Sequence, residues 1–143
     1  HNVLVYSEQP ICVKITDFGM SVDDSGTSSA NTHESLDDVI SVRWAPPEIL
    51  GAAAACVAPW SEKSDVWSFG VTVWQVYSEG EVPYTLSMSD PAVKSRVMSG
   101  HFLPTPHGCA PEMWTFMNMC WTFKPLDRPT FNGLKTILDS MLM

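Results

Sequence analysis

The tripeptide Asp17-Phe18-Gly19 constrains the first part of this chain more than any other feature, because it ends a pair of short apolar runs. Val3-Leu4-Val5 and Cys12-Val13-Lys14-Ile15 are rich in β-branched residues, and the polar stretch from Tyr6 to Pro10 separates them. Two such runs around a turn are typical of a β-hairpin. We therefore predict a hairpin with an enlarged turn, whose second strand delivers Asp17.

Helical signals dominate the rest of the chain. Asp65 is placed to cap a helix that runs to about Tyr77 and ends at Gly80, and apolar residues all round this helix predict burial. Asp90-Pro91 predicts a cap and a first-turn proline for a helix that closes at Gly100. The alanine-rich stretch 51–55 is open to a short helix or an insertion loop. Two stripes at i, i+3, i+4 and i+7 predict further helices: Met113, Phe116, Met117 and Cys120 after Pro111, and Leu134, Ile137, Leu138 and Met141 after a Thr130 cap.

The chain is acidic, with 16 Asp and Glu against 8 Lys and Arg and a net charge of −8. Nucleic acids and anionic membrane surfaces need clustered Lys and Arg, so neither is expected as a partner of this segment. No apolar run reaches the roughly 18–20 residues that cross a bilayer. A hydrophobic fraction of 45% in 143 residues fits a folded domain.

The cysteines are scattered without the paired spacing of a zinc site: Cys12, Cys56, Cys109 and Cys120. We therefore expect free thiols in a reducing, cytoplasmic setting. The first residues show no signal-peptide pattern. The chain begins with His1 rather than Met, which we interpret as the start of a partial chain.

Two side chains with oxygen donors, Asn2 and Asp17, stand at the two ends of the predicted hairpin. Folding the hairpin brings an amide carbonyl and a carboxylate together. Both are hard donors of the kind that Mg²⁺ takes when it bridges the phosphates of ATP. The two residues are thus of the right types to hold a metal ion.

Three further strings follow the hairpin in a fixed order: Pro46-Pro47-Glu48, the segment from Ser64 to Gly70, and Arg128-Pro129-Thr130-Phe131. Together with the hairpin they resemble the back half of a protein-kinase catalytic domain, from the end of the catalytic loop through the last helix. The resemblance implies an α+β fold, the mainly α-helical C-terminal lobe of the protein-kinase fold with one N-terminal β-hairpin. Residues 1–143 would be a partial kinase domain, with a metal-binding hairpin at 1–19, an activation and peptide-docking segment at 20–48, and a helical core at 61–143.

The same resemblance implies ATP and Mg²⁺ as cofactors of the parent enzyme, with Asn2 and Asp17 as the metal ligands. Phe18 would pack against a regulatory helix, and Gly19 would permit a backbone flip. The Gly-rich loop, the strand lysine and the catalytic aspartate of that family have no counterpart in this chain, so we expect the isolated chain to be inactive. His1 replaces the arginine that tyrosine kinases usually carry before the metal-binding asparagine.

The segment from Val42 to Glu48 resembles the peptide-docking segment of tyrosine kinases, where serine/threonine kinases usually carry Gly-Thr. By resemblance the docking residues are Arg43, Trp44, Pro46 and Pro47. The prolines would fix the backbone as a shelf for a flat tyrosine side chain. Cys120-Trp121 and Arg128–Phe131 also resemble the tyrosine-kinase end of the superfamily, although tyrosine-kinase-like serine/threonine enzymes share the second of these strings.

Three residues are given structural roles by the resemblance. Glu48 and Arg128 would form a buried ion pair, in which loss of one partner costs about 3–5 kcal/mol. Asp65 would accept backbone hydrogen bonds from the catalytic loop, and a plain helix cap explains the same position.

The segment from Met20 to Ser41 departs from the usual tyrosine-kinase pattern, because it contains no tyrosine. Two hypotheses remain for this segment. Either a serine/threonine kinase switches it by phosphorylating its serines or threonines, or its ordered conformation does not depend on phosphorylation. We interpret the parent as a tyrosine kinase of peptide or protein substrates, in the cytoplasm or in the intracellular part of a membrane receptor. The alternatives are a pseudokinase or protein-binding regulatory lobe, and a tyrosine-kinase-like serine/threonine kinase.

Overall fold

The computed structural model of the chain describes residues 2–18, 21, 40–52 and 60–142. The chain divides into two compact units, His1–Glu34 and Ser35–Met143. Within the described residues the first unit is a two-stranded antiparallel sheet and the second contains five α-helices. The predicted α+β class, with one hairpin ahead of a mainly helical lobe, is therefore confirmed.

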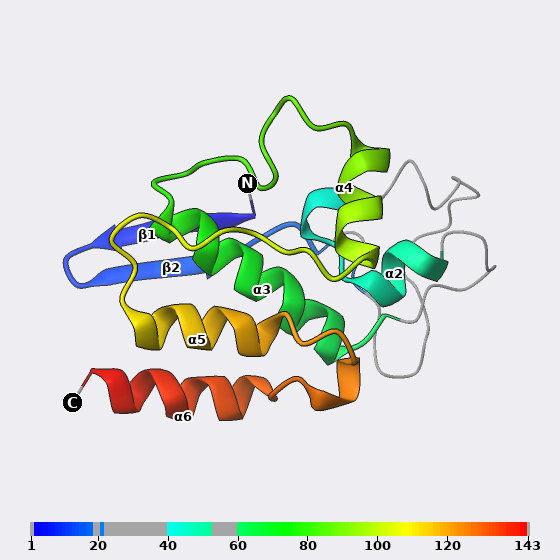
Figure 1. Cartoon of the computed structure of the whole chain (residues 1–143). Helices are drawn as coiled ribbons and strands as arrows, with labels where there is room; N and C mark the ends of the chain where they lie inside the picture. Colours follow the sequence, from blue (N-terminus) through cyan, green and yellow to red (C-terminus); the bar gives the residue numbers. More distant parts are fainter. Residues whose placement is uncertain (1, 19–20, 22–39, 53–59, 143) are drawn as a thin grey trace. The chain divides into compact units, whose positions relative to one another are not determined.

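The hairpin pairs β1, Val3–Glu8, with β2, Ile11–Ile15 (Figure 1). Its register runs from Val3 opposite Ile15 to Glu8 opposite Ile11, with a bulge between Val5 and Ser7. The prediction of an enlarged turn from Tyr6 to Pro10 is wrong, since β1 continues through Tyr6 and the turn is Gln9-Pro10. One reason is a cross-strand contact, because Nζ of Lys14 lies 3.7 Å from the centroid of the Tyr6 ring.

The second unit begins with the 3₁₀ turn η1, Val42–Trp44, and the short helix α2, Pro47–Ala52. Four longer elements follow: α3, Glu62–Tyr77; α4, Asp90–Met98; α5, Pro111–Cys120; and α6, Phe131–Met141. A second 3₁₀ turn, η2, spans Pro125–Asp127. In Figure 1 α3 runs through the middle of this unit, where it packs on α5, and α5 in turn packs on α6.

The core of the second unit is built around α3. Val66, Trp67, Val71 and Trp74 of this helix are buried, and they meet Phe116, Met117 and Cys120 of α5 and Leu134 of α6. A Cβ atom on Gly70 would lie 2.6 Å from Cβ of Cys120 and 2.8 Å from Nε1 of Trp121. Glycine at this position therefore allows α3 and α5 to approach closely. Most of the predicted apolar stripes lie on this core, but Met141 is exposed.

The helix ends follow local hydrogen bonding. Thr130 is the predicted cap of α6, and its Oγ1 accepts a hydrogen bond from the amide of Gly133 (3.1 Å). Gly80 lies just past α3 with φ +89° and donates its amide to the Gln75 carbonyl (2.8 Å), as predicted for a C-terminal glycine. The prediction of Asp65 as the N-cap of α3 is wrong.

The N-cap of α3 is Ser61, and Oγ of Ser64 accepts a hydrogen bond from the Ser61 amide (2.9 Å). This capping box begins the helix about one turn before the predicted cap at Asp65. Asp65 consequently lies inside the helix. The prediction of Asp90 as a cap is wrong in the same way, since Asp90 is the first residue of α4 and Ser89 is its N-cap.

The alanine-rich stretch belongs partly to α2, which includes Gly51 and Ala52. The rest of that stretch lies outside the described residues, as do Gly19 and the tyrosine-free segment 22–39.

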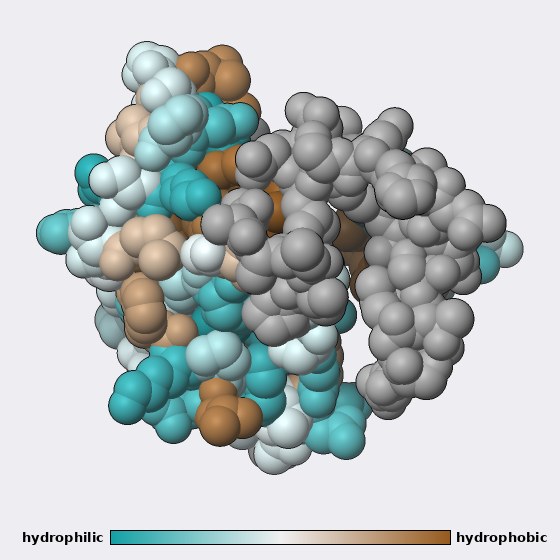
Figure 2. All heavy atoms as spheres, turned by 90° about the vertical axis from the view of Figure 1, so that its right-hand side faces the viewer, coloured by the Kyte–Doolittle hydropathy of each residue, from teal (hydrophilic) through white to brown (hydrophobic). Residues whose placement is uncertain are grey.

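On the face shown in Figure 2, hydrophobic surface lies in separate patches between hydrophilic side chains. No helix in the described part of the chain is long and apolar enough to cross a membrane.

Candidate functional site

The open end of the hairpin holds the two predicted metal ligands. The amide of Thr16 donates to the carbonyl of Asn2 (2.9 Å), one step beyond the last strand pair. This bond places Asn2 at the same end of the sheet as Asp17, as the sequence predicts. Both side chains are exposed, and Asp17 has φ +67°, a left-handed conformation that aspartate tolerates better than most residues.

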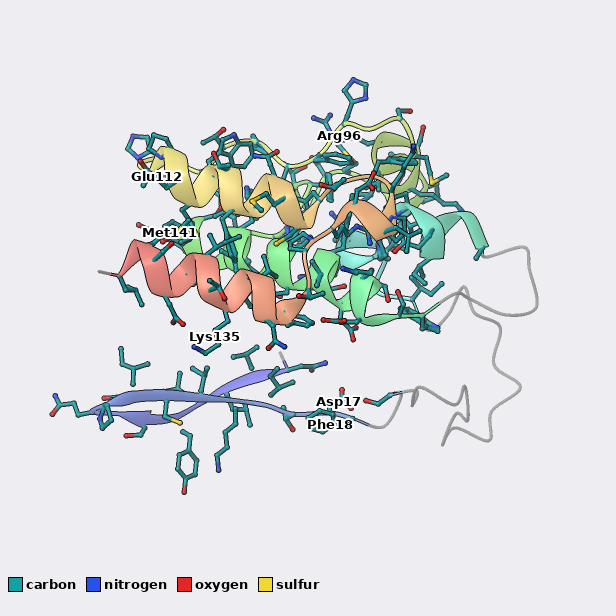
Figure 3. The ribbon with its side chains drawn as sticks, turned by 90° about the horizontal axis from the view of Figure 1, so that it is seen from below. Asp17, Phe18, Arg96, Glu112, Lys135 and Met141 are labelled. Carbon is teal, nitrogen blue, oxygen red and sulfur yellow. The ribbon has the colours of Figure 1, made fainter. Side chains whose placement is uncertain are left out.

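Phe18 follows directly, past the end of β2 (Figure 3), and 66% of its surface is exposed. The packing of Phe18 against a regulatory helix therefore stays a prediction.

The predicted docking segment, Val42 to Glu48, turns from η1 through extended backbone into α2. Pro46 is buried, and its carbonyl accepts the amides of Ile49 (3.1 Å) and Leu50 (3.0 Å). Pro47, also buried, is the first residue of α2, where its missing N–H costs nothing. The two prolines thus act on the backbone of the segment, and their side chains face the core.

Trp44 is half-buried, and its carbonyl accepts a hydrogen bond from Oγ of Ser68 on α3 (2.9 Å). This bond ties η1 to the central helix of the unit. This role of Ser68 was not predicted from the sequence. The sequence offers only a local indication for Ser68, which lies one helical turn after Ser64. Its Oγ also donates to the Ser64 carbonyl (3.2 Å).

Arg43 was predicted as a docking residue, and that role stays a prediction. Its guanidinium is hydrogen-bonded to the loop between α3 and α4. Nη1 donates to the carbonyls of Pro83 (2.8 Å) and Thr85 (2.9 Å), and Nη2 donates to the carbonyl of Met88 (2.5 Å). Oδ1 of Asp90 lies 3.6 Å from Nη2. Only 15% of the Arg43 side chain is exposed. Arg43 is therefore a largely buried side chain that binds the loop between α3 and α4.

Arg128 and Glu48 form the expected ion pair. Nη1 and Nη2 of Arg128 donate to the two carboxylate oxygens of Glu48, at 2.7 and 2.8 Å. The other N–H groups donate to the carbonyls of Lys63 (2.8 Å), Thr122 (2.8 Å) and Phe123 (3.2 Å). All five donors of a guanidinium are thus paired, which is what a fully buried arginine requires.

Two contacts around this arginine were not foreseen from the sequence. The guanidinium carbon lies 5.0 Å from the centroid of the Trp67 ring, and Nζ of Lys63 donates to the Arg128 carbonyl (2.6 Å). Both residues belong to the first turns of α3. The ion pair therefore joins the end of the docking segment, the start of α3 and the turn before α6.

The comparison with known families agrees with this geometry. A family profile described as protein tyrosine and serine/threonine kinase matches residues 1–138. The chain belongs to the protein kinase family.

Similar proteins include two tyrosine-protein kinases and one receptor. Tyrosine-protein kinase Btk of Drosophila melanogaster is 38% identical over 136 residues, which is 93% of this chain and 16% of the relative. Tyrosine-protein kinase Fer of Mus musculus is 35% identical over 134 residues, covering 91% of this chain and 15% of the relative. Human Ephrin type-A receptor 1 is 34% identical over 143 residues, covering 99% and 13%. The kinase chain thus spans about a sixth or less of the length of these relatives.

Asp65 of the kinase chain is exposed, in the first turn of α3. The pKa of its carboxyl is raised above the usual range, first because the group is partly desolvated and second because Glu62 repels its charge. Within the described residues no side-chain hydrogen bond to Asp65 is present, so its predicted partner in the catalytic loop stays a prediction.

No group of three or more His, Cys, Asp or Glu that could hold a metal ion is gathered in the described part of the kinase chain. The described cysteines, Cys12, Cys109 and Cys120, are free thiols. Burial raises the pKa of Cys120 to about 12, so that this thiol stays protonated at neutral pH.

Proposed function

We propose that the protein containing this chain is a tyrosine kinase, which transfers the γ-phosphoryl group of Mg-ATP to a tyrosine of a peptide or protein. The observation that carries the proposal is the anchoring of the segment Val42–Glu48 at both ends. Arg43 and Ser68 hold its start, and the Glu48–Arg128 pair holds its end. A segment held in this way is preorganised to position a peptide, and positioning is a large part of phosphoryl-transfer catalysis.

The donor set at the open end of the hairpin fits magnesium. An amide oxygen and a carboxylate are hard ligands, and Mg²⁺ in kinases is usually held by one or two such groups together with substrate phosphates. In this proposal Asn2 and Asp17 hold the metal ions, whose charge neutralises the phosphate oxygens during transfer. The exposure of both side chains leaves them accessible to a nucleotide.

In the docking segment, Trp44, Pro46 and Pro47 are proposed to shape the shelf on which the acceptor tyrosine lies. Val42-Arg43-Trp44 in place of Gly-Thr, and the names of the relatives Btk and Fer, favour tyrosine over serine and threonine. Since no counterpart of the catalytic aspartate or the ATP-binding lysine was recognised in these 143 residues, we expect transfer by the whole protein and not by this chain alone. The site of action is proposed to be the cytoplasm or the cytoplasmic side of a receptor.

The proposal is tested with the whole protein, radiolabelled ATP and a set of peptides that differ only in Tyr, Ser or Phe at one position. Asp17→Ala is compared with Asp139→Ala, the same replacement at an exposed position of α6. We expect label on the tyrosine peptide alone, and a loss of about a thousandfold or more with Asp17→Ala, because charge neutralisation of the phosphates is lost.

Each other outcome selects an alternative. Label on the serine peptide would indicate a tyrosine-kinase-like serine/threonine enzyme. Mg²⁺-dependent nucleotide binding without transfer to any peptide would indicate a pseudokinase. Full activity of Asp17→Ala would exclude its role as a metal ligand.

A further inference from the structure

The loop between α3 and α4, residues 82–88, has a strained backbone. Tyr84 and Thr85 are consecutive non-glycine residues with φ values of +64° and +63°. The left-handed region is unfavourable for both residue types, and it persists where surrounding contacts hold it. The backbone hydrogen bonds within the loop are long. The Thr85 amide donates to the Val82 carbonyl (3.2 Å), and the Met88 amide donates to the Thr85 carbonyl (3.3 Å), so these bonds contribute little to holding the loop.

The stronger contacts of this loop are made to a single side chain. The Arg43 guanidinium donates hydrogen bonds to three carbonyls of the loop, those of Pro83, Thr85 and Met88, at 2.5–2.9 Å. A planar guanidinium presents donors in several fixed directions, so it can bind carbonyls that converge from different sides of a loop. The buried Tyr84 provides the other anchor of the loop in the core.

On its other side Arg43 belongs to η1, which α3 holds through the Ser68 hydroxyl and the Trp44 carbonyl. The loop and the start of the docking segment are therefore joined through one residue. We propose that Arg43 is a positioning residue that holds loop 82–88 against the docking segment, so that the two form one rigid wall of the substrate site. This inference rests on the proposed kinase function for its catalytic consequence, but the contact itself can be tested without activity.

The test uses Arg43→Lys, which keeps the positive charge and the apolar stem but cannot place donors at two separate nitrogen positions. Arg96→Lys is the matched control, because Arg96 is exposed on α4 (Figure 3). In the 143-residue chain, hydrogen exchange at the Thr85 and Met88 amides is expected to rise about tenfold, equivalent to one charge-assisted hydrogen bond. Exchange in α5 is expected to stay unchanged.

In the whole protein, the KM for the tyrosine peptide is expected to rise about tenfold with Arg43→Lys, while the KM for ATP stays within about twofold. A residue with a merely structural role would lower the active fraction and leave both KM values unchanged. Thr85→Gly in the Arg43→Lys background is expected to restore part of the amide protection, because glycine adopts this φ without a steric penalty.

Unchanged exchange in Arg43→Lys would overturn the proposal, as would faster exchange with an unchanged peptide KM. The second result would leave the kinase function intact. If the unsubstituted protein phosphorylates no peptide, the kinase function fails, and the exchange data still decide whether Arg43 holds the loop.

Discussion

Arg128 donates to both carboxylate oxygens of Glu48, at 2.7 and 2.8 Å, although the two residues lie 80 positions apart in the sequence. None of the arginine side chain is exposed, and 16% of the glutamate side chain is. The pair is therefore a tertiary contact made away from water, and its energetics differ from those of a surface ion pair.

Removing one partner of this pair is expected to be strongly destabilising. Glu48→Gln leaves the Arg128 charge buried and uncompensated, and should lower the free energy of unfolding by about 3–5 kcal/mol. The control is Asp139→Asn, which breaks the exposed pair of Lys135 and Asp139 (2.6 Å) and should cost about 0.5 kcal/mol or less. Urea denaturation of the 143-residue chain measures both. Equal losses would contradict the distinction between buried and surface pairs.

Gly70→Ala is expected to disrupt the contact between α3 and α5. The added Cβ would lie 2.6 Å from Cβ of Cys120, and neither helix backbone can move without shifting the core, so a loss of about 1–3 kcal/mol follows. Gly51→Ala in α2 is the matched control, because its added Cβ would meet only the flexible end of Met98 at 3.5 Å. There alanine should be neutral or stabilising by up to about 1 kcal/mol. The midpoint of thermal unfolding should fall for Gly70→Ala and should stay level or rise for Gly51→Ala.

The cap of α6 offers a smaller and more local test. Thr130→Ala removes the acceptor for the Gly133 amide and should cost about 1 kcal/mol. Thr115→Ala, at an exposed position inside α5, is the control and should be neutral or slightly stabilising because alanine favours helix. Comparable losses in both variants would argue against the cap.

Stability is expected to fall at alkaline pH because two buried groups resist ionisation. Burial raises the pKa of Cys120 from 9.0 to about 12 and that of Tyr84 from 10.0 to about 12. In the unfolded chain both groups lose their protons earlier than in the folded chain, so the unfolded state is favoured as pH rises from about 9 to 12. Each group should contribute a slope of at most about 1.4 kcal/mol per pH unit in its window.

Denaturant unfolding of the chain at pH 7 to 11 measures this slope. Cys120→Ala should flatten the profile above pH 9, and Tyr84→Phe should flatten it above pH 10. If the stability of the unsubstituted chain stays level up to pH 11, the prediction that burial raises the pKa of both groups is wrong.

Local features of the fold were predictable from the sequence where neighbouring residues determine them. The Thr130 cap, the Gly80 stop after α3 and the start of α5 at Pro111 each depend on hydrogen bonds or φ angles within one turn. The hairpin was predicted too, but its turn was not, because the Tyr6–Lys14 contact forms only when the strands pair.

The start of α3 was predicted wrongly from the sequence. The prediction placed the cap at Asp65, whereas Ser61 caps the helix through its reciprocal bond with Ser64. The Glu48–Arg128 pair was expected from resemblance to a family, since no local pattern connects residues so far apart.

By itself the sequence determined the family, the order of hairpin and helices, and the residue types available at the candidate site. The tertiary structure alone decided the hydrogen-bond partners of Arg43, which are the backbone carbonyls of Pro83, Thr85 and Met88. Every residue type carries the same carbonyl, so a sequence cannot show which of them a side chain will meet. That choice follows from the packing of η1, α3 and α4, which brings a strained loop within reach of one guanidinium.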